Sequence, residues 1–239
     1  MRSEDIKYVI IQAGGKGIRM GRYAENKPKC LVPVKGVPII MNTIEKYKDK
    51  EIIIIADYKA DVLEAYLSNF CKYNFTVCQT TEQGTAGGLA KVVDSIPDDE
   101  PFVLTWADLF FEETPKFEFN KDLLVGLSDT FKCRWKLENN KFLNEASTDV
   151  GVAGFFAFKN KERFNKLSIS KSLVRGFLSE NYKDNEIDSF IMSNCFEVGE
   201  VDKYESILVN ELNHRFFNEV IIDSDKVTKR CIDPKYEDV

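Results

Sequence analysis

An apolar strand that runs directly into a glycine-rich loop constrains this chain more than any other feature. The segment reads IIQAGGKGIRM and spans residues 10–20. Gly14, Gly15 and Gly17 carry no Cβ, so the backbone can take positive φ there and bring its N–H groups close to an anion. Arg19 adds a planar set of donors that suits phosphate oxygens. The segment therefore predicts a loop that binds a nucleoside triphosphate.

This loop differs from two better-known phosphate loops. A P-loop requires a Gly-Lys pair followed by a hydroxyl residue, and this chain has none. A dinucleotide fingerprint requires Gly-x-Gly-x-x-Gly at the start of a helix, but Gly21 follows Gly17 one position late. Pro28, Pro33 and Pro38 also prevent a long helix from following the loop. A glycine loop without any ligand stays open as the alternative.

Composition indicates a single globular domain. The chain has 239 residues, of which 44% are hydrophobic and 30% charged, so it can bury a substantial core and is not a disordered polymer. No apolar run approaches the roughly 20 residues that span a membrane, and the polar first residues do not resemble a secretory signal. The six cysteines form no Cys-x-x-Cys pair, which argues against a zinc or redox site and favours reduced thiols in the cytoplasm.

Charge and histidine content exclude further classes of function. A net charge of −6 argues against a nucleic-acid partner, and nothing indicates a membrane partner. His214 is the only histidine, so Ser/His or Cys/His chemistry would depend on that one residue, and a structural role is favoured for it. Homo-oligomerisation stays open.

Hydrophobic periodicity predicts alternating strands and helices. Four consecutive isoleucines within residues 51–56 are typical of a strand buried on both faces of a parallel sheet. The other expected strands are 8–12, 75–79, 102–105, 123–128, 150–158 and a pair within 133–143; the expected helices are 39–47, 61–70, 88–94, 161–167 and 172–181. Trp106 to Asp108 would then lie at the carboxyl edge of an α/β sheet, where such folds bind ligands.

Several motifs, in order along most of the chain, resemble those of one family. They are GGKGIRM (14–20), KPKCLVPVKGVPII (27–40), GTAG (84–87), TWAD (105–108), GVAGFF (151–156) and FEVG (196–199), before Tyr204. Together they resemble the nucleotidyltransferases that make nucleotide-activated sugars. The resemblance implies a three-layer, Rossmann-like α/β fold with a mixed, mostly parallel sheet, of the nucleotide-diphospho-sugar transferase type.

The resemblance also implies a reaction, in which a phosphate monoester attacks the α-phosphorus of a nucleoside triphosphate and expels pyrophosphate. The second pKa of such a monoester is about 6, so it needs no general base near neutral pH. The barrier comes from bringing anions together, and cations lower it. Arg19 would hold the β- and γ-phosphates, and Lys29 would bridge the α-phosphate and the incoming phosphate. Lys27 is either a further contact or a solvated flank.

Mg²⁺ is the cofactor that the resemblance implies, held by two carboxylates. Asp108 matches the family's metal aspartate. The second acid is usually an Asp two residues before a glycine, and here Glu197 stands before Gly199. The longer side chain can reach the same ion. For both acids, a solvated side chain without metal is the alternative.

The remaining site residues also follow from matching positions. The residues expected to recognise the base are Gln79 and the loop at Gly84. An amide both donates and accepts hydrogen bonds and therefore suits the edge of a pyrimidine. Gln12 replaces an apolar residue of the family and either adds a polar contact or faces solvent. The full nucleotide-binding set is Gln12, Ala13, Gly14, Gly15, Gly17, Gln79, Gly84 and Thr85.

The acceptor pocket is expected at Trp106, Glu145 and Gly154. Gly154 matches the family glycine that approaches the sugar, and Glu145 falls where many members have a sugar-binding glutamate. The family's usual Glu-Lys-Pro is absent, because Glu145 is followed by Ala146-Ser147. A sugar 1-phosphate is the leading acceptor. The runner-up is a cytidylyltransferase for phosphocholine, a polyol phosphate or a phosphorylated amino acid, with Trp106, Trp135 and the pair Phe155-Phe156 against a cation or apolar body. A non-catalytic nucleotide-binding module of the same fold is the third alternative.

The end of the chain reads as a separate element. We expect residues 1–216 to form the nucleotidyltransferase domain and 217–239 a hairpin-like extension, with strands at 219–223 and 226–232. A hairpin alone is marginally stable. The strand at 227–229 faintly resembles the opening strands of choline-kinase-type enzymes. The extension therefore either docks on the transferase domain or begins a further domain of a longer, bifunctional protein.

Overall fold

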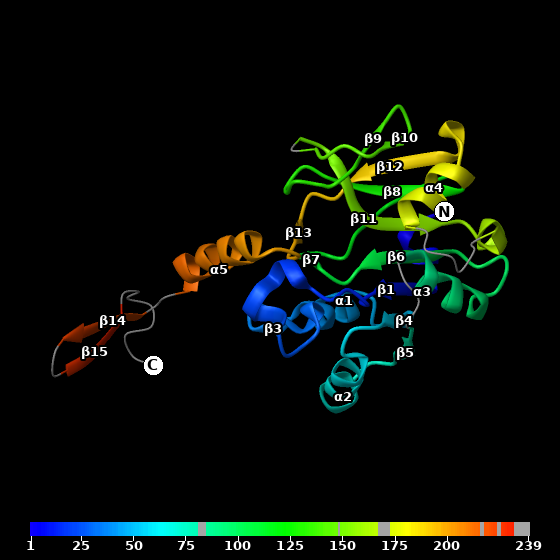
Figure 1. The fold of residues 1–239 in the computed structure, drawn as a ribbon. Helices are drawn as coiled ribbons and strands as arrows, with labels where there is room; N and C mark the ends of the chain where they lie inside the picture. Colours follow the sequence, from blue (N-terminus) through cyan, green and yellow to red (C-terminus); the bar gives the residue numbers. More distant parts are fainter. Residues whose placement is uncertain (81–84, 148, 167–172, 216–217, 224–225, 232–239) are drawn as a thin grey trace. The chain divides into compact units, whose positions relative to one another are not determined.

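The central element of the computed structural model is a seven-stranded sheet (Figure 1). The structure describes residues 1–80, 85–147, 149–166, 173–215, 218–223 and 226–231. The strands lie in the order β12-β8-β11-β6-β1-β4-β5. Their bounds are β1 (Tyr8–Gln12), β4 (Glu51–Ala56), β5 (Thr76–Gln79), β6 (Phe102–Trp106), β8 (Leu123–Ser128), β11 (Gly151–Phe158) and β12 (Ile187–Ile191). Only β11 runs antiparallel to its neighbours, β6 and β8, so the sheet is mixed and mostly parallel.

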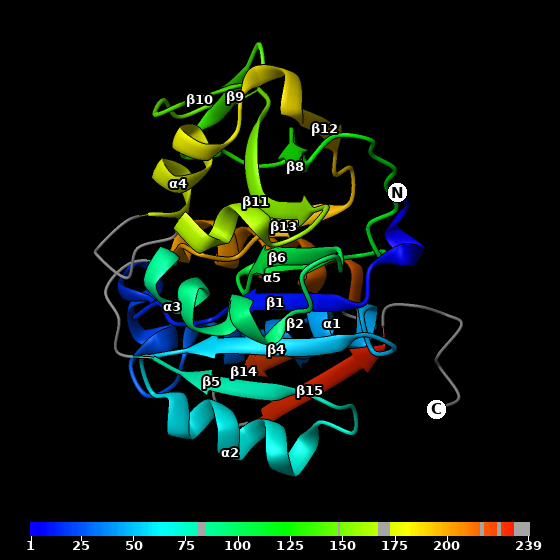
Figure 2. The same cartoon turned by 90° about the vertical axis from the view of Figure 1, so that its right-hand side faces the viewer.

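Helices cover both faces of the sheet because successive strand residues point to opposite sides. Val9 and Ile11 lie in one hydrophobic core, and Ile10 lies in the other. The first core includes residues of α1 (Ile39–Lys46) and α2 (Ala60–Phe70), and the second includes residues of α3 (Thr85–Val92) and α4 (Val174–Asn181). Figure 2 shows α3 and α1 on opposite sides of the strands. The predicted three-layer α/β fold is confirmed.

Short elements complete this unit. The 3₁₀ helices are Ser3–Asp5, Ile18–Ala24, Lys29–Leu31, Val93–Ser95, Glu162–Lys166 and Asp184–Glu186. The two-stranded ribbons pair β2 (Pro33–Val34) with β3 (Val37–Pro38), β7 (Leu109–Phe111) with β13 (Cys195–Glu197), and β9 (Lys136–Glu138) with β10 (Lys141–Leu143). The proline-rich segment after the glycine loop therefore holds one 3₁₀ turn and a tight ribbon, and no long helix, as its prolines predicted.

Most of the predicted elements are confirmed to within a few residues, with some differences. The helix expected at 88–94 begins at Thr85, and the one expected at 161–167 is a 3₁₀ turn whose last predicted residue lies outside the described residues. Residue 172, the predicted start of α4, also lies outside them. Strand β12 and helix α5 (Val201–Arg215) were not predicted. Strand β12 lies at the sheet edge and alternates buried with partly exposed residues, so its apolar signal is weak.

The chain divides into two compact units, Met1–Val201 and Asp202–Val239. Within the second unit, β14 (Asn218–Asp223) pairs antiparallel with β15 (Lys226–Cys231), so the predicted hairpin is confirmed; its turn at 224–225 and residue 232 lie outside the described residues. The division of function at residue 216 stays a prediction. Across the described ranges, no helix combines the length and the apolar character that a membrane crossing requires.

Candidate functional site

A cleft of about 770 Å³ opens at the carboxyl edge of the parallel strands. Gln12 and Trp106 end the adjacent strands β1 and β6, in register with each other, and both line it. The other predicted site residues that line the cleft are Gly14, Gly15, Gly17, Arg19, Lys29, Thr85, Asp108 and Glu197. Ala13 lies buried beneath the loop, where its N–H donates to the Ile55 carbonyl at 2.8 Å. Gly84 lies outside the described residues.

The first glycine loop folds closely over Lys29. Gly17 has φ +66°, and a Cβ there would stand 3.0 Å from both Ala24 Cβ and Lys29 Cβ. The Met20 N–H donates to the Gly17 carbonyl at 2.8 Å, which starts the next 3₁₀ turn. At Gly15 a Cβ would lie 3.7 Å from Lys29 Cε. The loop thus needs glycine at position 17 and holds Lys29 directly against its backbone.

Lys29 and Asp108 form a mostly buried ion pair in the cleft. The Lys29 ammonium donates to Asp108 Oδ2, and the two side chains are 17% and 7% exposed. The other carboxylate oxygen, Asp108 Oδ1, is buried and has no hydrogen-bond partner among the described residues. A buried acceptor in this state is costly unless a ligand or ion satisfies it. Lys29 and Asp108 come from a 3₁₀ turn and a strand end that lie far apart in the sequence, as the resemblance implied.

The two-stranded ribbon of β7 and β13 brings Glu197 close to Asp108. Glu197 pairs with Leu109 in that ribbon, and the Val198 N–H donates to the Asp108 carbonyl at 2.8 Å. A Cβ at Gly199 would stand 2.9 Å from Asp108 Oδ2 and closer still to Glu197 Oε1. The two carboxylates therefore converge on a space that exists only because residue 199 is glycine.

This pair of carboxylates fits a Mg²⁺ site that substrate completes. Mg²⁺ is usually held by one or two carboxylates together with phosphate oxygens and water. The described residues contain no group of three or more metal-binding side chains, so the protein alone offers no closed cage. The unsatisfied Asp108 Oδ1 and the space beside Gly199 match the two-carboxylate arrangement.

Arg19 lies at the mouth of the cleft. Its guanidinium forms an ion pair with Glu200, and both side chains are about two-fifths exposed, at 41% and 39%. Sequence reasoning did not identify Glu200, although it directly follows the FEVG motif. An exposed pair of this kind contributes little free energy, so a polyphosphate can displace Glu200 from Arg19.

Besides Ala13 and Gly154, the predicted residues Gln79 and Glu145 also do not line the cleft. The Gln79 side-chain amide donates to Glu64 Oε2 of α2 at 3.0 Å, on the exposed side of edge strand β5. Glu145 is 64% exposed and pairs with Lys136 at 3.0 Å. Their assigned roles stay predictions, since no contact with the cleft supports them.

Gly154 packs against Trp106, a residue that lines the cleft. It has φ +97° at a register shift in β11, and a Cβ there would stand 2.6 Å from Trp106 Nε1. Trp106 packs edge-on against Phe156, with ring centroids 5.6 Å apart. Gly154 therefore makes room for the indole, and Trp106 forms the wall that an acceptor would touch. Phe155 and Phe156 are fully buried core residues and do not line the cleft.

The cleft also has basic lining residues, which sequence reasoning missed. Lys132, Arg134 and Arg175 line it. The Arg175 guanidinium donates to the side-chain oxygen of Asn144, a neutral partner. Lys132 and Arg134 lie in an irregular segment after β8 that carries no periodic signal, and only the tertiary fold brings them into the same cleft as Arg175.

Two buried cysteines near the site, Cys30 and Cys195, are not nucleophiles. Burial raises the pKa of the Cys30 thiol to about 12, more than the charge of neighbouring Lys29 lowers it. Burial, and then the charge of Asp108, raises the pKa of Cys195 as well. Both thiols stay protonated near neutral pH, and a protonated thiol is a poor nucleophile.

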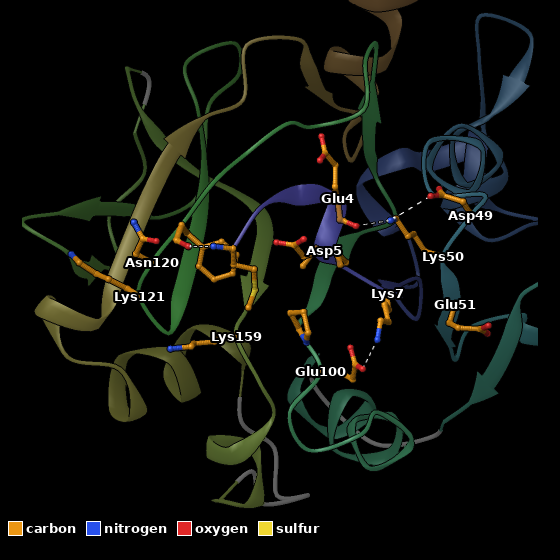
Figure 3. Close-up of a pocket in the computed structure, with 14 residues that line it drawn as sticks. Glu4, Asp5, Lys7, Asp49, Lys50, Glu51, Glu100, Asn120, Lys121 and Lys159 are labelled. Atoms are coloured by element: carbon orange, nitrogen blue, oxygen red, sulfur yellow. Dashed lines mark hydrogen bonds and ion pairs between the residues drawn. The ribbon is translucent and has the colours of Figure 1, made fainter.

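A second hollow, of about 860 Å³, lies at the amino edge of the same sheet (Figure 3). Its charged side chains largely neutralise one another: Lys7 pairs with Glu100 at 2.6 Å, and Lys50 pairs with Asp49 at 3.3 Å. No glycine lines it, and none of the predicted site residues does. It is similar in size to the carboxyl-edge cleft, but its lining includes no glycine loop for an anion.

Known proteins match the part of the sequence that carries the glycine loop of the cleft. The MobA-like NTP transferase domain matches residues 9–115. The bifunctional protein GlmU of Methanocaldococcus jannaschii is 34% identical over 108 residues, which are 44% of this chain and 25% of the relative. Glucose-1-phosphate cytidylyltransferase of Salmonella typhimurium is 28% identical over 126 residues, which are 41% of this chain and 49% of the relative.

Solved structures agree in fold. The inositol-1-phosphate CTP transferase from T. maritima has a TM-score of 0.68 at 13% identity, covering 89% of this chain and 98% of that one. The chain spans about half or less of the length of the two curated relatives. Residues 9–115 hold the glycine loop, Lys29 and Asp108. The match to the MobA-like NTP transferase domain and the likeness to these relatives and structures confirm the resemblance to nucleotidyltransferases that the motifs predicted.

Proposed function

We propose that the chain is a Mg²⁺-dependent nucleotidyltransferase that joins a nucleoside triphosphate to a phosphorylated acceptor and releases pyrophosphate. The observation that carries this proposal is the grouping of Lys29, Asp108 and Glu197 in the cleft that the first glycine loop also lines. A glycine loop, a lysine and two carboxylates in one cleft can receive a polyphosphate and an ion together.

Each cationic residue has a role in this reaction. Arg19 exchanges Glu200 for the β- and γ-phosphates, which stabilises the pyrophosphate as it leaves. Lys29 sits between the loop and Asp108, so its ammonium can contact the α-phosphate and the attacking phosphate at once. Bringing two anions together against fixed cations is the electrostatic stabilisation that the reaction requires.

Asp108 and Glu197 would hold the Mg²⁺. Bound there, the ion would neutralise phosphate oxygens and make the α-phosphorus more electrophilic. Asp108 also keeps Lys29 in place through its Oδ2 atom, and this contact leaves Oδ1 as the oxygen still without a partner. Neither buried thiol takes part, and no side chain is needed to remove a proton from the acceptor phosphate.

The acceptor that we propose is a sugar 1-phosphate. Both curated relatives described above bear names of sugar-phosphate or related bifunctional enzymes. The basic lining residues Lys132, Arg134 and Arg175 favour a neutral or anionic acceptor over a cationic one such as phosphocholine. Phe155 and Phe156 are buried and cannot enclose a cation.

A cytidylyltransferase for a polyol phosphate is the second candidate. The fold of the inositol-1-phosphate CTP transferase supports it, and the neutral, polar character of a polyol is compatible with the basic lining residues. We also propose a pyrimidine nucleotide and a cytoplasmic location. The location rests on the cysteine composition, since the described cysteines form no disulfide.

A pyrophosphate-release screen tests the proposed function. Purified protein is incubated with Mg²⁺ and each of CTP, UTP, ATP and GTP, together with glucose 1-phosphate, inositol 1-phosphate or phosphocholine. We expect release with at least one pair, and loss of release in Lys29→Ala. Absence of release with every pair, in protein that melts cooperatively, contradicts the proposal.

A further inference from the structure

Gln12 presents an unsatisfied polar atom inside the cleft. It is the last residue of β1 and lines the cleft with Gly14, Thr80 and Thr85. Its Oε1 atom is buried and has no hydrogen-bond partner among the described residues. Buried amide oxygens nearly always accept a hydrogen bond. A buried amide oxygen without a partner therefore indicates that a bound molecule supplies the donor. The family pattern has an apolar residue at this position, so the amide is a departure that the fold itself does not require.

The backbone around Gln12 is held rigidly. The Gln12 carbonyl accepts from the Ala107 N–H at 3.1 Å, and the next residue, Ala13, donates to the Ile55 carbonyl at 2.8 Å. Strand β1 lies between β4 and β6, in the middle of the sheet. The amide therefore projects from a fixed point, which is the arrangement that a selective contact needs.

Two glycine residues lie beside the amide. Gln12 Nε2 lies 3.9 Å from the position that a Cβ would take at Gly14 and 3.7 Å from that position at Gly88. A Cβ at Gly88 would also stand 3.3 Å from Thr80 Cγ2. The amide thus lies between the first glycine loop, the end of β5 and helix α3.

The glycine loop has a phosphate side and an amide side. Gly15 and Gly17 face Lys29, which belongs to the group expected to hold the phosphates. Gly14 faces Gln12 and Asp57 instead. Phosphate oxygens carry no hydrogen to donate, so they cannot satisfy Gln12 Oε1. The donors that a nucleotide offers away from its phosphates are the N–H groups of its base and the ribose hydroxyls.

We propose that Gln12 reads the nucleobase, with its carboxamide paired to the hydrogen-bonding edge of the base. This inference rests on the proposed nucleotide site. A carboxamide accepts through its oxygen and donates through its nitrogen, and can therefore tell bases apart by their donor and acceptor order. Gln79, the residue first expected in this role, donates its amide to Glu64 instead. The two glutamines make the inference testable against a matched control.

The test compares Gln12→Leu with Gln79→Ala. For each variant, kcat/KM is measured with Mg²⁺ and CTP, UTP, ATP or GTP, and with the 2′-deoxy form of the preferred nucleotide. We expect Gln12→Leu to shrink the ratio between the preferred base and the others at least about tenfold, the value of one good hydrogen bond. Gln79→Ala should leave that ratio within about twofold of the unchanged protein.

Three results would overturn the inference. They are an unchanged ratio in Gln12→Leu, a loss of base preference confined to Gln79→Ala, and an effect on ribose against deoxyribose alone. Thermal melting separates a folding role from recognition. Because leucine removes an unsatisfied buried oxygen, we expect Gln12→Leu to melt no lower than the unchanged protein. A lower melting temperature together with equal losses for all four nucleotides would mark a structural residue.

A second readout separates this inference from the proposed reaction. The shift in melting temperature that each nucleotide produces reports binding without turnover. If no pair of substrates reacts, the proposed function fails. Base-selective stabilisation that Gln12→Leu abolishes would still support the inference, and stabilisation without any base preference in the unchanged protein would contradict it.

Discussion

The two hollows at opposite edges of the sheet are similar in size and different in chemistry. The amino-edge hollow measures about 860 Å³ and the carboxyl-edge cleft about 770 Å³. In the first, charged side chains pair with one another at the surface, as Lys7 does with Glu100 and Lys50 with Asp49 (Figure 3). In the second, Gln12 Oε1 and Asp108 Oδ1 are buried and have no hydrogen-bond partner in the part of the chain that the structure describes.

This difference identifies the cleft better than volume does. Exposed charges in high dielectric interact only weakly with any ion, and in the amino-edge hollow opposite charges lie side by side, so a charged ligand gains little there. Buried acceptors without partners gain a full hydrogen bond or an ion contact when substrate arrives. The central claim is therefore that nucleotide and metal bind at the carboxyl edge and leave the amino edge empty.

Removing the metal should have the largest effect. EDTA-treated protein should lose nearly all pyrophosphate release, and Asp108→Asn should lose most of it, with only partial rescue by excess Mg²⁺. Asparagine keeps the shape of the side chain and removes its charge. Asp188→Asn is the matched control at the sheet's β12 edge, and it should retain activity. Full activity after chelation would refute a role for metal.

Removing a cation from the cleft should come next. Lys29→Ala and Arg19→Ala should each lower kcat at least about 100-fold, the scale of losing one preorganised group that stabilises developing charge. Lys7→Ala, from the amino-edge hollow, should leave kcat unchanged. Steady-state kinetics at saturating substrate measure all three. Equal kcat in Lys29→Ala and Lys7→Ala would remove the distinction between the two hollows.

Gly154→Ala should produce a smaller, mixed effect. Alanine at positive φ costs about 1–3 kcal/mol, and at position 154 it would also collide with the Trp106 indole. Gly36→Ala is the control. Gly36 also has a positive φ, of +76°, but a Cβ there would have no atom of the described residues within 4 Å. We expect the larger loss of unfolding free energy in Gly154→Ala, together with a raised KM for the acceptor. Identical denaturation curves for the two variants would show that the collision with Trp106 adds nothing to the loss of unfolding free energy.

The smallest expected effect concerns the exposed pair at the cleft mouth. In Glu200→Gln, Arg19 no longer has to leave a carboxylate before it binds phosphate. Exposed pairs are worth at most about 1 kcal/mol, so the KM for the nucleotide should fall by up to about fivefold with kcat unchanged. Glu113→Gln, an exposed change outside the cleft, should leave KM as it is. A raised KM in Glu200→Gln would mean that Glu200 itself supports binding.

Local patterns predicted the fold and the phosphate side of the cleft. Isoleucine runs and helical periodicity identified most elements, and a carboxyl-edge position for Asp108 followed from the end of β6. Strand β12 was missed because an edge strand buries only part of its surface. Gln79 was expected in the cleft, but contact with Glu64 of a neighbouring helix decides where its amide lies.

Other residues of the cleft come together only through tertiary contacts, which local sequence patterns do not predict. The ribbon of β7 and β13 brings Glu197 beside Asp108, and the resemblance identified Glu197 only through its spacing from Gly199. Arg134 and Arg175 line the same cleft although they come from segments that are far apart in the sequence. Contacts of this kind depend on the packed sheet, because the residues are distant along the chain.

A crystal structure with Mg²⁺ and a non-hydrolysable analogue of the preferred nucleotide tests the central claim most directly. We expect the triphosphate against Gly14 to Gly17 and Lys29, the ion between Asp108 and Glu197, and the base at Gln12. Density for the nucleotide in the amino-edge hollow, or an ion bound away from both carboxylates, would contradict the account.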